Sequence, residues 1–125
     1  MCSGTAGRLL LVVDDDPGIR ESLADLLHDE GYTVMTAVNG KDALVRLRAS
    51  STTPCVILLD LMMPVMSGAE FYDELRNDPS LADIPVVVIS ADGNGRRKAQ
   101  AMASEFIAKP VKIETVLSAV ESHCA

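Results

Sequence analysis

The sequence of this 125-residue chain contains no tryptophan, and aromatic residues make up only 3% of it. Hydrophobic residues still account for 48%, so the core must be built from aliphatic side chains and methionine. No apolar run approaches the ~20 residues that a membrane span needs, and the first residues lack the pattern of a signal peptide. These absences favour one cytoplasmic domain, long enough to bury a substantial core.

Positive charge is also scarce, because 11 Lys and Arg residues face 18 Asp and Glu residues, for a net charge of -7. Direct binding to nucleic acid is disfavoured, since it depends on cations that displace counterions. The acidic surplus suits a divalent cation or a basic protein surface better. The cysteines Cys2, Cys55 and Cys124 lie far apart and lack metal-ligand spacing. We expect free thiols in a reducing cytosol.

Short apolar runs alternate with helical patterns along the chain. Asp16 followed by Pro17 predicts the start of a first helix, and Gly31 predicts its end. Asn39-Gly40 and Gly68 predict the starts of two more helices. Strands are expected at 9–13, 33–37, 56–60, 86–90 and 105–108. A fourth helix is expected at 96–102, and the helical spacing of Ile113, Val116, Leu117 and Val120 predicts a fifth.

This alternation predicts an α/β fold with a parallel sheet and helices on both faces. The first, third and fourth runs are apolar throughout and are expected in the centre, whereas Thr33, Thr36 and Glu105 mark the second and fifth runs as edges. With right-handed crossovers, we predict a flavodoxin-like, doubly wound sheet of five strands in the order 2-1-3-4-5. We expect a flexible tail at 1–8 and one domain at 9–125.

Three acids follow the strands at the predicted switch point between strands one and three. Asp14 and Asp15 follow the first run, and Asp60 ends the run Val56-Ile57-Leu58-Leu59. Ligands of open α/β folds bind in the crevice at such a point. The fold and the acids therefore indicate the same location.

Carboxylates crowded at one edge repel one another, and a divalent cation relieves that repulsion. Mg²⁺ takes oxygen ligands, usually one or two carboxylates with waters and phosphate oxygens. We expect Asp15 and Asp60 as direct ligands, Asp14 as a ligand through water, and the backbone carbonyl of Met62 as a further oxygen. The predicted cofactor is Mg²⁺.

The same edge has the groups that phosphoryl transfer requires, which are mainly positioning and charge neutralisation. Asp60 can act as a nucleophile and form an acyl phosphate. Lys109 ends the fifth run and can hold one phosphoryl oxygen, while Ser90 ends the fourth and can donate a hydrogen bond to another. We therefore expect these three side chains to meet in one pocket.

Four motifs together carry a resemblance to a known family: LLVVDDD, VILLDLMMPVMSG, VVVISA and FIAKP. In this order and spacing, from about Leu9 to Val120, the chain resembles the receiver domain of two-component response regulators, of the stand-alone chemotaxis-regulator kind. The resemblance implies a signalling domain that catalyses only its own phosphorylation and dephosphorylation. It implies a sensor histidine kinase or histidine phosphotransfer protein as the phosphohistidine donor.

The resemblance also implies roles for single residues: Asp60 as phosphoacceptor, Asp14 and Asp15 as the metal pair, Ser90 as hydroxyl switch, Lys109 as phosphate-binding lysine, and Phe106 as rotamer switch. An output partner would bind the face formed by the fourth helix, fifth strand and fifth helix. A cis bond between Lys109 and Pro110 is expected, and Asp92 would tune the phosphoryl lifetime together with Met62.

Phe106 departs from the family's commoner tyrosine, and Met102 and Val111 also depart from its pattern. These positions lie on the output side, so they bear on the partner more than on the chemistry. The chain is expected to act alone, as a diffusible regulator or phosphorelay intermediate, or to be a piece of a longer protein.

Three other functions are weighed against the same residues. A degenerate receiver would serve only as a docking module, although the intact acidic set argues against it. A haloacid-dehalogenase-like phosphatase would use Asp14 and Asp16, but it would leave Asp60 unexplained in a chain that is short for that fold. A flavodoxin-like cofactor binder is disfavoured because no phosphate-binding loop follows the first run.

Overall fold

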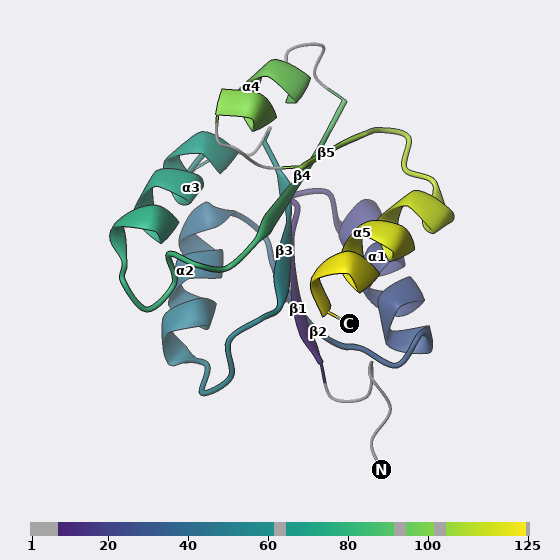
Figure 1. The fold of residues 1–125 in the computed structure, drawn as a ribbon, viewed down its shortest axis with the longest axis horizontal. Coiled ribbons are helices and arrows are strands. Elements are labelled where there is room, and N and C mark those ends of the chain that lie inside the picture. Colours follow the sequence, from purple (N-terminus) through teal and green to yellow (C-terminus); the bar gives the residue numbers. More distant parts are fainter. Residues whose placement is uncertain (1–7, 62–64, 92–94, 102–104, 125) are drawn as a thin grey trace.

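Five parallel strands form one sheet in the order β2-β1-β3-β4-β5 (Figure 1). The computed structural model describes residues 8–61, 65–91, 95–101 and 105–124. The strands are β1 Leu9–Val13, β2 Thr33–Ala37, β3 Val56–Asp60, β4 Val86–Ser90 and β5 Glu105–Ala108. The helices are α1 Pro17–Asp29, α2 Gly40–Ala49, α3 Gly68–Asn77, α4 Gly95–Ala101 and α5 Ile113–Cys124. The predicted flavodoxin-like class and strand order are confirmed.

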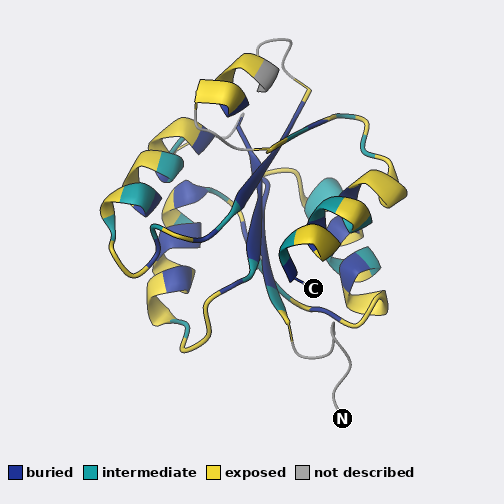
Figure 2. Ribbon diagram, viewed as in Figure 1, coloured by how far each residue is buried: buried dark blue, intermediate teal, exposed yellow. Residues whose placement is uncertain are grey.

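Burial follows the predicted division into central and edge strands (Figure 2). Every residue of β3 and β4 is buried, because helices cover both faces of the sheet there. Residues of β2 and β5 are largely half-buried or exposed. The polar residues Thr33 and Glu105 are exposed at the starts of these two edge strands.

Alternating side chains along the strands divide the core into two layers. Leu11 of β1 and Ile57 of β3 pack against α2, α3 and α4 on one face. Leu10 and Leu58 pack with α1 and α5 on the other. Figure 1 shows α2 and α3 on the opposite side of the sheet from α1 and α5. Because both faces are covered, the ends of the strands are where polar groups can reach solvent.

Side-chain caps set the starts of the helices near one edge of this sheet. The carboxylate of Asp16 accepts hydrogen bonds from the backbone N–H groups of Gly18 and Ile19 at the start of α1. Ser67 and Glu70 form a capping box at the start of α3. Gly31 follows α1 with φ 99°, a conformation that glycine adopts without steric cost. The predicted roles of Asp16 and Gly31 are confirmed.

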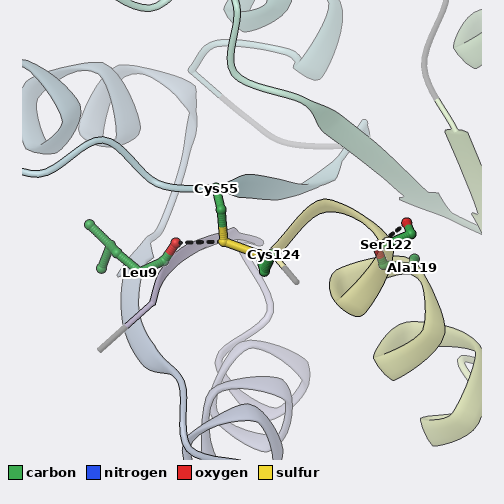
Figure 3. Close-up of a disulfide and its surroundings, with 5 residues drawn as sticks. All are labelled: Leu9, Cys55, Ala119, Ser122 and Cys124. Carbon is green, nitrogen blue, oxygen red and sulfur yellow. Dashed lines mark hydrogen bonds between the residues drawn. A yellow bond between two sulfur atoms is a disulfide. The ribbon is translucent and has the colours of Figure 1, made fainter. Parts of the chain in front are cut away.

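The expectation of free thiols is wrong for two of the three cysteines. Cys55 and Cys124 form a disulfide with a Cα–Cα distance of 5.4 Å (Figure 3). Cys55 directly precedes β3 and Cys124 ends α5, so the fold brings together residues separated by 69 positions in the sequence. Cys2 lies outside the described residues.

Two further sequence expectations change in detail. Ile113, the first residue of the apolar spacing that predicts the last helix, is 54% exposed at the start of α5. Val116 and Val120 form the buried part of that helix. The fourth helix begins at Gly95 rather than Arg96, and Met102 lies outside the described residues. No helix within the described ranges has the length and apolar character needed to cross a membrane.

Candidate functional site

Three carboxylates converge at the carboxyl ends of two neighbouring strands. Asp14 follows β1 and Asp60 ends β3, and the two strands run in register up to Val13 and Leu59. One carboxylate oxygen from each of Asp14, Asp15 and Asp60 lies within 4.8 Å of the others. Asp14 is 3% exposed and Asp60 5% exposed, whereas Asp15 is exposed to solvent. The sequence-predicted acids therefore form one cluster with a single solvent-facing member.

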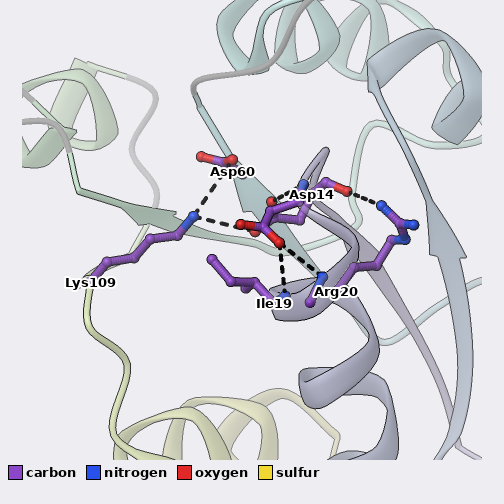
Figure 4. Close-up of polar contacts among 7 residues, drawn as sticks. Asp14, Ile19, Arg20, Asp60 and Lys109 are labelled. Carbon is purple, nitrogen blue, oxygen red and sulfur yellow. Dashed lines mark hydrogen bonds and ion pairs between the residues drawn. The ribbon is translucent and has the colours of Figure 1, made fainter.

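Lys109 brings a cation to this cluster from beyond the end of β5. Its Nζ lies 3.3 Å from Asp14 Oδ2 and 3.6 Å from Asp60 Oδ2 (Figure 4). The Lys109 side chain is 16% exposed, so the charges interact through a poorly screened medium. The backbone N–H of Lys109 donates a 3.0 Å hydrogen bond to the carbonyl of Ser90, which fixes the base of the side chain.

The bond that follows Lys109 is a cis peptide to Pro110. This isomer was expected from the family resemblance alone. Cis peptides are largely restricted to such X-Pro bonds.

Asp14 is held in place by four polar contacts that involve both its backbone and its side chain. Its Oδ1 accepts a hydrogen bond from the backbone N–H of Asp16 at 2.9 Å, while Oδ2 faces Lys109. Its N–H donates to the carbonyl of Ala37 at 3.2 Å. The guanidinium of Arg20 donates from Nη1 to the Asp14 carbonyl at 2.8 Å (Figure 4). Both carboxylate oxygens are thus engaged, which suits indirect metal binding better than direct ligation.

Arg20 is the site residue that sequence reasoning missed. It lies in the first turns of α1, six residues after Asp14, and it acts on a backbone carbonyl. A lone arginine at the solvent-facing side of an expected helix gives no signal for such a contact. Only the folded turn between β1 and α1 brings the guanidinium back over the strand end.

Gly68 allows the start of α3 to lie directly against the end of β3. A Cβ added to Gly68 would lie 2.8 Å from the Cα of Leu61 and 3.0 Å from the carbonyl oxygen of Asp60. The N–H of Gly68 donates to the carbonyl of Leu61 at 3.3 Å. The backbone around Asp60 is therefore supported by a contact that only glycine permits.

Ser90 and Phe106 lie on the two strands beside the cluster. Ser90 is buried at the end of β4, adjacent in the sheet to Asp60, whose register partner is Ile89. Phe106 is half-buried on β5 and packs against the core layer formed with α2, α3 and α4. Ser90 lies at the carboxyl end of its strand, whereas Phe106 pairs with Val88 in the middle of β4. The expected Met62 carbonyl ligand and the expected role of Asp92 lie outside the described residues.

The charges of this arrangement define the chemistry that it can support. Three carboxylates and one lysine leave a net charge of about -2 in a small, partly buried volume. A hard dication with oxygen ligands compensates that charge, and it accepts carboxylates and water together. Lysine next to a strand-end carboxylate additionally provides a cationic contact for an anion such as a phosphoryl group. The cluster is therefore suited to a divalent cation.

A doubly wound α/β domain with acids and a lysine at its switch point is a class found among signalling and nucleotide-handling proteins. Residues 10–121 match the response regulator receiver domain family. This chain therefore belongs to the receiver domain family of two-component response regulators.

Named relatives agree with this assignment. The chain is 30% identical over 120 residues to protein PilG of Pseudomonas aeruginosa, covering 94% of this chain and 87% of PilG. It is 34% identical over 116 residues to the DNA-binding dual master transcriptional regulator RpaA of Synechocystis sp., covering 90% of this chain. The chain spans 47% of RpaA, about half its length.

A solved structure of similar fold is a complex with a metal ion and a fluoride. The response regulator protein TrrA from Thermotoga maritima, in complex with Mg²⁺-BeF, matches with a TM-score of 0.80 and 32% identity. The match covers 92% of this chain and 97% of that one. The fold and the family are thus established together, and the haloacid-dehalogenase alternative has no support.

Proposed function

We propose that this receiver domain accepts a phosphoryl group on Asp60 in a Mg²⁺-dependent reaction. The observation that carries the proposal is the position of Lys109 Nζ, 3.3 Å from Asp14 and 3.6 Å from Asp60. This contact brings together the ends of strands that lie far apart in the sequence, since Asp14 and Lys109 are 95 positions apart. It combines a nucleophile, a metal-binding acid and a cation in one pocket.

The proposed metal site uses the acids according to their surroundings. Asp60 and the exposed Asp15 are the direct ligands, and Asp14, whose oxygens already contact Lys109 and the Asp16 N–H, acts through water. The backbone carbonyl of Met62 completes the protein ligands in this proposal. When bound, Mg²⁺ neutralises charge on the phosphoryl oxygens. TrrA, whose solved structure is a complex with Mg²⁺-BeF, supports the choice of ion.

The transfer itself is a displacement at phosphorus. A carboxylate oxygen of Asp60 attacks the phosphorus atom of a phosphohistidine, the P–N bond breaks, and the imidazole leaves with its electron pair. Lys109 would turn from Asp14 and Asp60 toward a phosphoryl oxygen and keep its positive charge beside the growing negative charge. The Ser90 hydroxyl would donate a hydrogen bond to another oxygen. Hydrolysis of the acyl phosphate by water returns the domain to its initial state.

The proposed output is a change in the surface formed by α4, β5 and α5. A phosphoryl group would draw the Ser90 hydroxyl toward it, and Phe106 on the neighbouring strand would turn into the space vacated. Phe106 has no hydroxyl, so its outward state would be held by packing alone. Asp92, next to the site in sequence, would tune the lifetime of the phosphoryl group.

The proposed partners follow from this cycle. A sensor histidine kinase or a histidine phosphotransfer protein supplies the phosphoryl group, and an output protein binds the α4-β5-α5 surface. The acidic net charge of -7 supports a protein partner over direct nucleic-acid binding. We place the domain in the cytoplasm, with residues 9–125 as the receiver and residues 1–8 as a tail.

The test is incubation with Mg²⁺ and acetyl phosphate, read by intact mass. Wild type is expected to gain one phosphoryl group, and omission of Mg²⁺ or addition of a chelator is expected to abolish the gain. Asp60→Asn removes the nucleophile and should not be labelled. Asp83→Asn, which alters an exposed acid near the amino end of β4, is the matched control and should be labelled like wild type.

Two results would favour other functions. Equal labelling of wild type and Asp60→Asn would remove Asp60 from the mechanism. No labelling of wild type, together with no Mg²⁺ binding, would support the degenerate receiver that acts only as a docking module.

A further inference from the structure

The disulfide lies at the amino end of β3, and the acidic cluster lies at the carboxyl end of the same strand. Cys55 directly precedes β3, whose other end carries Asp60, and Cys124 is the last residue of α5. Figure 3 shows the bond joining the loop before β3 to the end of that helix. Nothing in the proposed phosphoryl transfer uses these sulfur atoms, so their pairing calls for a separate explanation.

The surroundings of the sulfur atoms suit a thiol state as well as a disulfide state. Cys55 Sγ lies 3.3 Å from the carbonyl oxygen of Leu9, and that carbonyl already accepts the backbone N–H of Cys55 at 2.9 Å. A reduced Cys55 can donate its S–H to the same oxygen. Cys124 is fully buried in the core layer with α1, where a free cysteine behaves as a small apolar side chain. Neither sulfur needs a new partner after reduction.

The two cysteines differ in exposure. Cys55 is half-buried and lines a surface hollow of about 270 Å³, which is also lined by His123 of α5 and by Ser80 and Asp83. Cys124 is fully buried. A small thiol can therefore approach Cys55 through this hollow, and Cys124 is the sulfur that leaves.

The bond also fixes one end of an element that the proposed output surface contains. The neighbouring residue His123 places its Nε2 2.7 Å from Oε1 of Glu105, at the start of β5. The end of α5 is thus attached by two consecutive side chains, to the segment just before β3 through Cys124 and to β5 through His123. Once the disulfide is broken, the contact between the half-buried His123 and the exposed Glu105 is the one of these two attachments that remains.

We propose that Cys55 and Cys124 are a reversible thiol–disulfide exchange site that controls how firmly the end of α5 is attached to the sheet. A thiolate of a dithiol reductant attacks Cys55 Sγ, the bond to Cys124 breaks, and Cys124 takes up a proton. The second thiol of the reductant then displaces Cys55. In total, two electrons and two protons pass to the cysteines, and the reductant becomes a disulfide. In a cytoplasmic domain such a bond is expected to be transient and redox-sensing.

Alkylation under native conditions tests the exchange directly. In a Cys2→Ser background, protein treated with glutathione disulfide should take up no alkyl group. Protein treated with dithiothreitol without denaturant should take up one, at Cys55, and a second only after denaturation, because Cys124 is fully buried. Renewed treatment with glutathione disulfide should restore the unlabelled form. Two labels under all conditions, or no label until the protein is denatured, would overturn the proposal.

Thermal unfolding and hydrogen exchange test the attachment of α5. Reduction is expected to lower the Tm by about 10 °C, because the bond closes a long loop of the unfolded chain. Amide exchange should accelerate in the last turns of α5 and stay unchanged in α2. Cys55→Ala should have the lower Tm and lose its response to dithiothreitol, whereas Cys2→Ser should keep the response. A Tm and an exchange pattern that ignore reduction would contradict the proposal.

These readouts do not involve phosphorylation. Failure of the redox experiments therefore leaves the phosphoacceptor proposal intact, and an unlabelled Asp60 leaves the redox proposal intact. Acetyl phosphate labelling of the oxidised and reduced forms then shows whether the two sites communicate across the sheet.

Discussion

Replacing Lys109 with methionine tests the electrostatic arrangement on which the site depends. Methionine keeps much of the length and apolar volume of the side chain and removes its charge. In the wild-type protein the ammonium group lies 3.3 Å from Asp14 and 3.6 Å from Asp60. The substitution therefore removes a cation that contacts two buried carboxylates.

The distances give the Coulomb attraction of Lys109 to the two carboxylates, which desolvation partly offsets. At an effective dielectric constant of about 20, each of the two contacts is worth about 5 kcal/mol of Coulomb attraction before desolvation is counted. Breaking a buried ion pair typically costs about 3–5 kcal/mol. Because Lys109 is 16% exposed, we expect the lower end, about 3 kcal/mol of unfolding free energy. Mg²⁺ should restore most of it, since the ion takes over the neutralising role.

The same substitution should strengthen Mg²⁺ binding. A lysine 3.6 Å from the proposed ligand Asp60 repels an incoming dication, so its removal should tighten binding by about tenfold or more. Phosphorylation from acetyl phosphate should nevertheless become slower, because the phosphoryl oxygens lose a cationic contact. Tighter metal binding with slower transfer is a combination that a purely structural lysine would not produce.

Urea unfolding followed by circular dichroism, with and without Mg²⁺, measures the stability change, and isothermal titration calorimetry measures the affinity. Lys41→Met, an exposed lysine in the first turn of α2, is the matched control and should change stability by less than about 0.5 kcal/mol. If Lys109→Met binds Mg²⁺ as weakly as wild type or more weakly, the metal does not share the carboxylates that Lys109 contacts, and the reasoning fails.

Two further substitutions address the frame of the site and the core. Gly68→Ala should cost about 1–3 kcal/mol of unfolding free energy and should slow phosphorylation, because its Cβ would lie 2.8 Å from the Cα of Leu61, the residue after Asp60. Urea unfolding measures the stability and mass labelling measures the phosphorylation. An unchanged stability would contradict the close contact. Tyr32→Phe should cost little, because the buried Tyr32 hydroxyl has no hydrogen-bond partner among the described residues. Burial and the nearby charges of Glu121 and Glu30 raise the pKa of Tyr32 above 10.0. The folded state therefore holds the Tyr32 proton more tightly than the unfolded state. Wild type should lose stability as the pH rises from 10.0 through the folded pKa, and Tyr32→Phe should lose less. Parallel pH–stability curves for the two proteins would refute this.

The sequence was sufficient for the fold because its apolar runs differ in kind. The runs that became β3 and β4 have no polar residue before their ends, and both strands are buried on both faces. The run that became β2 has threonines, and it lies at an edge. Strand order and crossover handedness then left one switch point, where the acids are found. The prediction of the acidic cluster followed from topology alone.

Three features could not be predicted, each for a physical reason. The Cys55–Cys124 bond joins residues 69 positions apart, and its proximity depends on how the end of α5 packs against the start of β3. The Arg20 contact goes to a backbone carbonyl, which no residue pattern encodes. The apolar spacing of the last helix included Ile113, but spacing alone does not tell that the first turn of α5 extends beyond the core.

Chemical mapping of the phosphorylated residue tests the central claim most directly. After incubation with Mg²⁺ and acetyl phosphate, borohydride reduction converts an aspartyl phosphate into homoserine, and peptide mass spectrometry locates the changed residue. The account predicts one conversion, at Asp60, that disappears when Mg²⁺ is omitted. Conversion at Asp14 or Asp15 instead, or conversion at Asp60 that is independent of Mg²⁺, would contradict it.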